Sequence, residues 1–202
     1  MNSQPMSAES NEELDRLDMA QLAAGQDASL NLLMERHGPK LFHYLIRVLQ
    51  DEAEASDLAQ ETFVRVYQHR ARFNSGQKFS TWLYAIATNL ARDRLRWRAR
   101  HPQVSLDAEH EETGGNMADT LKSSSLSPAE TLQEEERAVA VRNAVAALPE
   151  EVRLPLVLAE YEGRSQAEIA AILKCSIKAV EMRIYRARQE LRARLSKLLE
   201  QL

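Results

Sequence analysis

Two arginine clusters are the residues whose type and spacing point most directly to a chemistry, the binding of phosphate. Residues 92–101 contain five arginines against Asp93 alone, and residues 183–197 contain six basic side chains against Glu190. Guanidinium groups bind phosphate oxygens through charge and paired hydrogen bonds. The chain as a whole has a formal net charge of −4, and residues 1–62 hold twelve acids against four bases. This distribution predicts two separate nucleic-acid contacts and an acidic surface for another partner; the alternative is two ordinary solvated helix faces.

An aromatic loop precedes the first arginine cluster. Phe73 and Phe79 enclose a polar run that contains Gly76, and Trp82 follows at the start of a predicted long helix. Aromatic rings can stack on unpaired bases while basic side chains hold the backbone, so the segment suits single-stranded nucleic acid. The alternative for each ring taken alone is a place in the core. We expect the outward face of the helix to carry Thr81, Thr88, Asn89, Arg92 and Arg96.

The second arginine cluster lies on a predicted helix-turn-helix. Ser165-Gln166-Ala167-Glu168 is a capping-box sequence that begins a short helix, and Cys175-Ser176 breaks it. A longer helix follows from Ile177 with a continuous apolar stripe. This pattern is typical of DNA-binding helix pairs, although a simple helical hairpin is the alternative. Opposite the stripe lie Lys178, Met182, Tyr185, Arg186 and Gln189, with Glu181 and Arg183 on the flanks.

An acidic helical segment, Asp57-Leu58-Ala59-Gln60-Glu61-Thr62-Phe63, lies within a helix expected to run to about Tyr67. At helical spacing Asp57, Gln60 and Glu61 share one side. Such a face is usually just solvated, but it can also dock on a basic partner helix.

The elements that must position these groups are all helical. Alanine and leucine are abundant, β-branched residues are sparse, and aromatic residues make up only 5% of the chain. We therefore predict an all-α fold of two small helical domains, residues 14–100 and 128–200, the second carrying the helix-turn-helix. Residues 101–127, which contain glycine, serine and acidic residues, are expected to form a flexible acidic linker.

Two local signals mark the second domain. Ser127-Pro128-Ala129-Glu130 supplies a capping serine, a proline at the first helical position and a glutamate three residues after the cap. The helix expected over about 150–162 contains Pro155, so we predict that it starts late or kinks there, and that Gly163 ends it.

Other classes of protein find little support. The five histidines show no metal-ligand spacing, Cys175 is the only cysteine, and no glycine motif for a phosphate loop occurs. We expect no enzymatic activity, no catalytic residues, no cofactor and no metal. The N-terminus does not resemble a secretory signal, and no apolar run approaches the ~20 residues that span a bilayer. The expectation is a cytoplasmic protein without membrane insertion.

In this order and spacing the segments resemble the extracytoplasmic-function (ECF) group of the sigma-70 family, the RNA polymerase sigma factors. The acidic helix is similar to the family's core-binding helix, residues 81–89 to its −10 recognition segment, and residues 147–151 and 162–188 to its −35-binding domain. The resemblance implies an alternative sigma factor that binds core polymerase, recognises both promoter elements and promotes strand opening. The alternative is a helix-turn-helix repressor or activator that does not replace a sigma factor.

The resemblance also implies partners and site residues. Asp57, Gln60 and Glu61 would contact the β′ clamp helices of core polymerase, whose β subunit is a further partner, and an anti-sigma factor would hold the protein inactive. The expected −10 DNA contacts are Phe73, Ser75, Lys78, Phe79, Ser80, Trp82, Asn89, Arg92 and Arg96. The expected −35 DNA contacts are Ser176, Lys178, Glu181, Met182, Arg183, Tyr185 and Arg186. Glu181-Met182 departs from the family pattern, and a glutamate favours cytosine N4, so the −35 sequence should not be borrowed from relatives.

Overall fold

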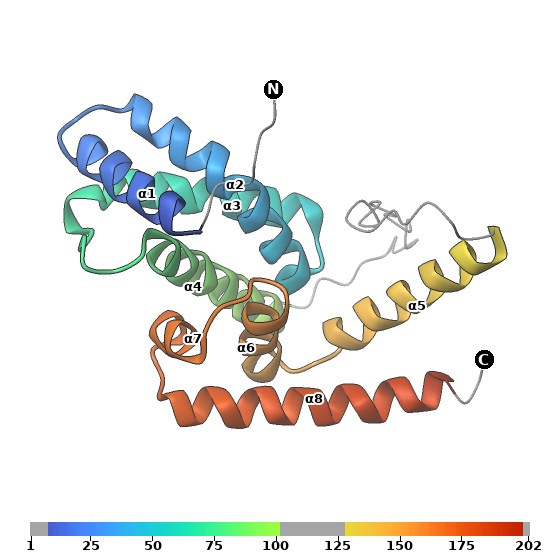
Figure 1. Cartoon of the computed structure of the whole chain (residues 1–202). Helices are drawn as coiled ribbons and strands as arrows, with labels where there is room; N and C mark the ends of the chain where they lie inside the picture. Colours follow the sequence, from blue (N-terminus) through green and yellow to red (C-terminus); the bar gives the residue numbers. More distant parts are fainter. Residues whose placement is uncertain (1–7, 102–127, 200–202) are drawn as a thin grey trace.

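The computed structural model describes residues 8–101 and 128–199, and within them every regular element is a helix (Figure 1). The predicted all-α class is confirmed. In chain order the elements are α1 (Ala8–Ala23), α2 (Ala28–Leu49), α3 (Glu52–Gln68), the 3₁₀ turn η1 (Arg70–Arg72), α4 (Phe79–Arg100), α5 (Pro128–Ala146), α6 (Glu150–Glu160), α7 (Gln166–Leu173) and α8 (Ile177–Leu199). The expected linker lies almost entirely outside the described residues.

Helices α1 to α4 form the N-terminal domain around a core centred on α2. Tyr44 and Tyr84 are fully buried there with their rings 5.1 Å apart, and the Tyr44 and Thr88 hydroxyls share a hydrogen bond of 2.8 Å. The expectation that Thr81 and Thr88 face outward is wrong, because both are buried. Thr88 is tolerated in the core because Tyr44 satisfies its hydroxyl.

The ends of the N-terminal helices are fixed by local chemistry. Asp51 caps α3 by accepting a hydrogen bond of 2.8 Å from the backbone N–H of Glu54. Gln50, in the left-handed conformation, ends α2 and turns the chain directly into α3. Helix α3 ends at Gln68, which agrees with the predicted end near Tyr67.

Helices α5 to α8 form the C-terminal domain. The predicted capping box is confirmed: the backbone N–H of Glu168 donates to Ser165 Oγ, and the Glu168 carboxylate accepts from the Ser165 backbone N–H at 2.9 Å. Lys174, in the left-handed conformation, ends α7, and α8 begins at Ile177 as predicted. The short helix, tight turn and long helix of the predicted helix-turn-helix are therefore present, with Ile169 and Val180 buried between them. The predicted capping serine, Ser127, lies outside the described residues.

Pro155 does not delay the start of α6, which excludes the first of the two effects expected from the sequence, a late start or a kink. The helix runs continuously from Glu150 to Glu160 with Pro155 inside it. Proline removes one backbone hydrogen bond, but Leu154, Leu156 and Val157 are all buried, and this burial of apolar surface offsets the loss. Gly163, at φ +61°, then reverses the chain just beyond the helix, close to its predicted role.

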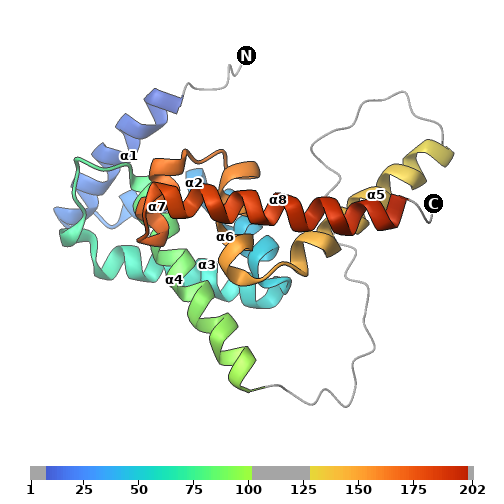
Figure 2. The same cartoon turned by 90° about the horizontal axis from the view of Figure 1, so that it is seen from below.

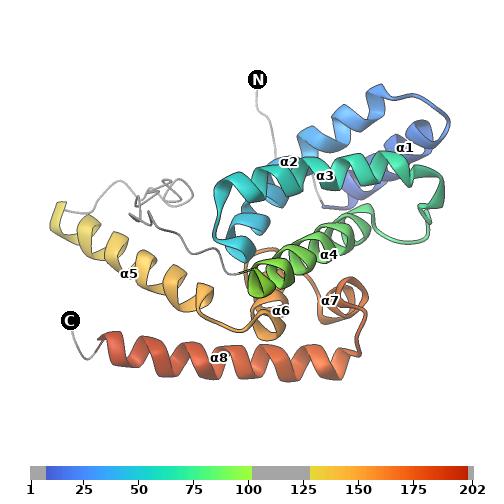
Figure 3. The same cartoon turned by 180° about the vertical axis from the view of Figure 1, so that it is seen from behind.

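The two domains pack directly on one another. Helix α7 lies along α4, and α6 lies against α2, so one hydrophobic core runs through both domains (Figures 1 and 3). Helix α8 crosses in front of α6 when the molecule is seen from below (Figure 2). None of the described helices has the length and apolar character needed to cross a membrane.

Candidate nucleic-acid and polymerase interface

The acidic face of α3 is on the surface, as its spacing predicts. Asp57 and Gln60 are exposed, and Glu61 is partly exposed with its carboxylate 2.8 Å from Arg65 Nε. Val64, which is 46% exposed, continues the same stripe seven residues after Asp57. Sequence reasoning missed Val64, although its place at the i+7 position was a readable signal. The result is an exposed stripe with both acidic and apolar groups.

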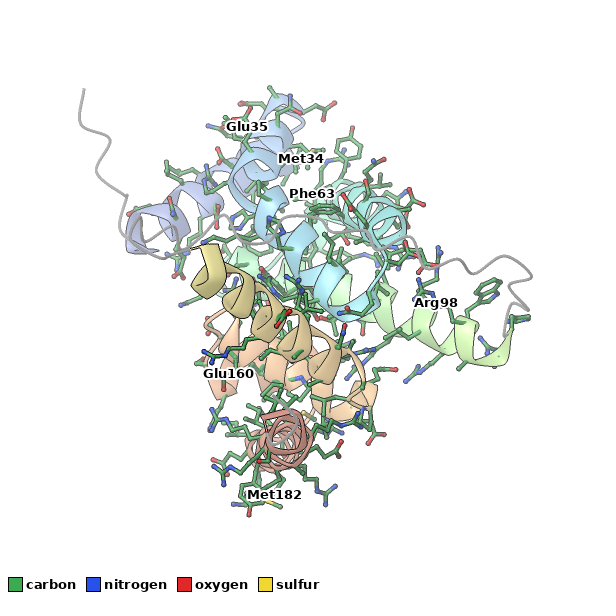
Figure 4. All side chains as sticks on the ribbon, turned by 90° about the vertical axis from the view of Figure 1, so that its right-hand side faces the viewer. Met34, Glu35, Phe63, Arg98, Glu160 and Met182 are labelled. Carbon is green, nitrogen blue, oxygen red and sulfur yellow. The ribbon has the colours of Figure 1, made fainter. Side chains whose placement is uncertain are left out.

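Apolar side chains are also exposed on the neighbouring helix. Helix α2 packs beside α3, and its residues Leu32 and Met34 are 47% and 39% exposed. Figure 4 labels Met34 on this helix. Side chains of this kind exposed on adjacent helices mark a surface that can bury apolar area against a partner. An acidic rim with apolar groups suits a basic, amphipathic helix better than it suits DNA.

The aromatic loop before α4 is a packed cluster. Phe79 is only 1% exposed and its ring lies 5.1 Å from that of His37. It is therefore a core residue and offers no exposed ring on which an unpaired base could stack. Phe73 and Trp82 are partly buried with their rings 5.2 Å apart. Ser75 and Lys78 are exposed on the loop that the aromatic rings support.

Helix α1 supports this loop from the other side. Arg36 pairs with Asp18 at 2.7 Å and also with Asp15, which in turn lies 2.9 Å from His37 Nε2. Both aspartates are buried, which ties α1 firmly to α2. Because the His37 ring contacts Phe79, this cluster fixes the position of the loop as well as of α1.

The first arginine cluster is divided between contacts within the protein and open surface. Arg98 lies 3.2 Å from Asp51 and donates to the Leu49 carbonyl oxygen at 2.9 Å, and Arg94 lies 3.2 Å from Glu54. These two arginines hold the α2–α3 corner against α4. Arg96 remains exposed, Asn89 is partly buried, and Arg92 lies 3.3 Å from Glu150 of the C-terminal domain.

The N-terminal half of α8 presents the predicted reading face to solvent. Lys178, Met182, Tyr185 and Arg186 are all exposed, with Tyr185 at 59%. Met182 points away from the rest of the molecule (Figure 4).

The remaining −35 candidates are partly engaged in holding α8 itself. Ser176 caps the helix by accepting a hydrogen bond of 3.2 Å from the backbone N–H of Ala179. Glu181 lies 3.2 Å from Lys178, and Arg183 is partly buried. The groups that remain open for base readout are therefore those of the exposed face.

A buried polar cluster joins the two domains, and nothing in the sequence pattern pointed to it. We call Glu162, Tyr84, Arg47 and Arg164 the Glu162 cluster. The Glu162 side chain is only 5% exposed; its carboxylate accepts from the Tyr84 hydroxyl at 2.5 Å and lies 3.4 Å from Arg47. Burial and the neighbouring Glu162 charge raise the pKa of Tyr84 above its ordinary value, so the phenol stays protonated as a donor.

Comparison with known proteins agrees with this arrangement. Residues 33–101 match the family model described as Sigma-70 region 2, and residues 138–191 match Sigma-70, region 4. The RNA polymerase sigma-H factor of Pseudomonas aeruginosa is 32% identical over 190 residues, covering 94% of this chain and 98% of that protein. The ECF RNA polymerase sigma-E factor of Escherichia coli is 32% identical over 179 residues, covering 87% and 91%. Among solved structures, CnrH in complex with the cytosolic domain of CnrY is 29% identical with a TM-score of 0.66, covering 91% of this chain and 98% of CnrH.

Proposed function

The chain belongs to the ECF group of the sigma-70 family of RNA polymerase sigma factors, and on that premise we propose how its residues divide the work of promoter recognition. It is an alternative sigma factor, which binds core polymerase, recognises the −35 and −10 promoter elements and promotes strand opening. A helix-turn-helix regulator that acts without core polymerase would leave the region 2 match over residues 33–101 unexplained. In this division residues 14–100 serve core polymerase and the −10 element, and residues 128–200 serve the −35 element.

Core polymerase is bound by the α3 stripe. Asp57, Gln60 and Glu61 meet basic groups of the β′ clamp helices, and Val64 and Met34 bury apolar area beside them. The exposure of all five supports this assignment. Charge attraction steers the encounter, while the apolar groups slow dissociation.

The −10 element is bound as a single strand at the loop and the outer side of α4. Ser75, Lys78 and Ser80 line the loop that receives an extruded base, and Phe73, Phe79 and Trp82 hold the loop in shape. Asn89, Arg92 and Arg96 follow along α4 toward the backbone phosphates. Extruding a base costs a few kcal/mol of lost stacking, which a pocket that accepts the base offsets.

The −35 element is read in the major groove by the start of α8. Lys178, Met182, Tyr185 and Arg186 meet base edges and phosphates, with Ser176 and Arg183 beside them. Glu181 accepts a hydrogen bond from cytosine N4 once its pairing with Lys178 is released. This charge balance predicts a −35 sequence that differs from those of relatives with arginine at this position.

Regulation, location and activity follow the family. An anti-sigma factor is the expected inhibitor. The similar protein CnrH has been solved in complex with the cytosolic domain of CnrY, which supports a protein partner for this chain too. Transcription places the protein in the cytoplasm. Its role is that of an initiation factor without chemistry of its own.

The observation that carries these assignments is the exposure of the α3 stripe on one domain and of the α8 reading face on the other. Run-off transcription tests them, with purified sigma-free core polymerase and the promoter upstream of this chain's own gene, because the family often drives its own expression. We expect specific initiation that falls by about tenfold or more in the Asp57→Ala/Glu61→Ala variant, since each lost interfacial charge contact contributes roughly 1 kcal/mol or more.

The matched control is Glu13→Ala/Glu52→Ala, which removes the same charge from exposed positions outside the α3 stripe. It should initiate as well as the parent chain. Equal loss in both variants would show that net charge and not the α3 stripe matters. Absence of any transcript, together with failure to co-purify with core polymerase, would overturn the residue assignments.

A further inference from the structure

Three side chains proposed to contact the −10 strand are already paired with the C-terminal domain. The pairs are Ser80 Oγ with Arg164 Nη1 at 2.8 Å, Lys78 Nζ with Glu168 at 3.4 Å, and Arg92 Nε with Glu150 at 3.3 Å. In the last two pairs a carboxylate occupies a basic group that would otherwise meet a DNA phosphate. Single-stranded DNA and the C-terminal domain therefore compete for the same side chains of the N-terminal domain.

The Glu162 cluster lies at the centre of this contact. Tyr84 donates to the Glu162 carboxylate, Arg47 lies 3.4 Å from it, and the Arg164 guanidinium stacks over the Tyr84 ring at 4.5 Å. Arg47 also stacks over Tyr161, which precedes Glu162, at 4.6 Å. Two residues of the N-terminal domain, Tyr84 and Arg47, thus meet one almost fully buried carboxylate of the C-terminal domain, and each of them also stacks on a second residue of that domain.

A buried carboxylate makes such a contact cooperative. Ionised groups out of water are costly unless their partners remain in place, so loss of one partner destabilises the whole cluster. The contact is therefore expected to open as a unit, with the domains either together or apart. The surrounding ion pairs, which are more exposed, are individually weaker.

The −35 face is left out of this contact. Met182 lies on the side of α8 that points away from the N-terminal domain (Figure 4), and Tyr185 is exposed as well. Glu160, only two residues before Glu162, pairs instead with Arg188 of α8 at 2.6 Å, within the C-terminal domain. The closed arrangement therefore covers one DNA-binding surface and spares the other.

We propose that the free protein is closed, with its own C-terminal domain occupying three of the −10-binding side chains, Lys78, Ser80 and Arg92, and that the Glu162 cluster holds this state. The proposal rests on the −10 assignment made above. Closing lowers the apparent affinity for strand DNA in proportion to the fraction of molecules that are open. Ligands that bind only the open form shift the population toward it.

The test compares Glu162→Lys with Glu160→Lys in the full-length chain. Glu162→Lys places a positive charge against Arg47 and removes the acceptor of the Tyr84 hydroxyl, whereas Glu160→Lys makes the same charge change outside the interdomain contact. Small-angle X-ray scattering reports separation of the domains. Fluorescence anisotropy reports binding of a labelled single strand, the non-template −10 region of the promoter used for run-off transcription. Circular dichroism checks that both variants keep their helices.

We expect Glu162→Lys to have a larger radius of gyration and to bind the strand about tenfold more tightly than the parent chain, if about a tenth of the parent molecules are open. Glu160→Lys should be compact and should bind like the parent. The charge-swapped double variant Arg47→Glu/Glu162→Lys should recover much of the compactness and lose most of the gain in affinity.

Three outcomes would overturn the proposal. The first is a parent chain that is already extended in solution, and the second is an equal gain of affinity in Glu160→Lys. The third is separation in Glu162→Lys without tighter strand binding. In that third case, normal transcription by the parent chain would leave the sigma-factor assignment intact and remove only the inference of masking.

Discussion

The two surfaces that we propose to bind DNA are built in opposite ways. The proposed −35 face belongs to a single helix, α8, and two of its residues, Met182 and Tyr185, are exposed. The −10 surface is assembled from a loop and a helix, rests on buried Phe79, and shares Lys78 and Arg92 with the other domain. The proposed −35 surface is exposed as it stands. In our proposal the −10 surface becomes fully available only after the domains part, because Ser80 and Arg92 are paired with the C-terminal domain.

The difference suggests a sequence of events for binding. Duplex DNA can meet α8 while the molecule is closed, but the −10 element becomes single-stranded only during promoter opening. A surface that is covered until that stage does not bind single-stranded nucleic acid from outside the promoter. Changing one surface at a time therefore tests whether the two surfaces act independently.

The largest expected effect is on −35 binding. Arg186→Glu should weaken binding of a −35 duplex from the same promoter by about 100-fold, because an arginine contact is lost and a repulsive charge replaces it. Arg142→Glu, an exposed position on α5, is the control for the charge change. Glu162→Lys should leave this affinity within about twofold, because closing does not cover α8. Fluorescence anisotropy of the labelled −35 duplex, without polymerase, measures the affinity of all three variants. A strong effect of Glu162→Lys on this affinity would show that the two surfaces are not independent.

A smaller effect separates two neighbouring arginines of α4. Arg98→Ala should lower the free energy of unfolding by about 1–2 kcal/mol, because Arg98 holds the Leu49 carbonyl oxygen and the Asp51 carboxylate while remaining partly exposed. Arg96→Ala should change stability by less than about 0.5 kcal/mol and should instead weaken strand binding in a Glu162→Lys background. Urea denaturation measures the free energy of unfolding, and fluorescence anisotropy measures strand binding. Equal losses of stability in the two variants would show that both arginines stabilise the fold.

The smallest effect concerns pH and the cap of α7. Burial raises the pKa of Glu168, but hydrogen bonds from Ser165 and the charge of Lys78 outweigh burial and leave the pKa below its ordinary value. The carboxylate therefore stabilises the fold fully above pH 4.5, its ordinary pKa, and loses this contribution as the pH falls through the lowered value. Glu168→Gln should lower the free energy of unfolding by about 1 kcal/mol or less at pH 7. The difference in stability between this variant and the parent chain should narrow at a pH of about 3. Melting temperatures at both pH values test this, and a constant gap would contradict it.

Local chemistry made part of this structure predictable. The capping box of Ser165 and Glu168, the start of α8 at Ile177 and the exposed acidic face of α3 all follow from residues within one or two turns of each other. Helical spacing reports which side of a helix is apolar, and this is sufficient for a surface built on one helix. The exposure of the proposed −35 face was therefore predictable from the sequence alone.

Contacts between distant residues were not predictable in this way. Thr88 was expected on the outward face of its helix, and only its hydrogen bond with Tyr44, on another helix, explains its burial. Arg92 was counted with a basic stripe because its partner, Glu150, belongs to the other domain. Spacing along one helix says nothing about which residue of another helix will face it. The −10 surface depends on such contacts and was correspondingly harder to place.

The Glu162 cluster has a consequence for how the protein responds to its own abundance. Both sides of the contact belong to one chain, so the fraction of closed molecules does not change when the protein is diluted or overproduced. An inhibitor on a separate chain is exceeded in number once enough of the protein is made. The intramolecular contact, in contrast, is part of every molecule synthesised. A cell holding a few molecules and a cell holding thousands would thus contain the same proportion of molecules with a covered −10 surface.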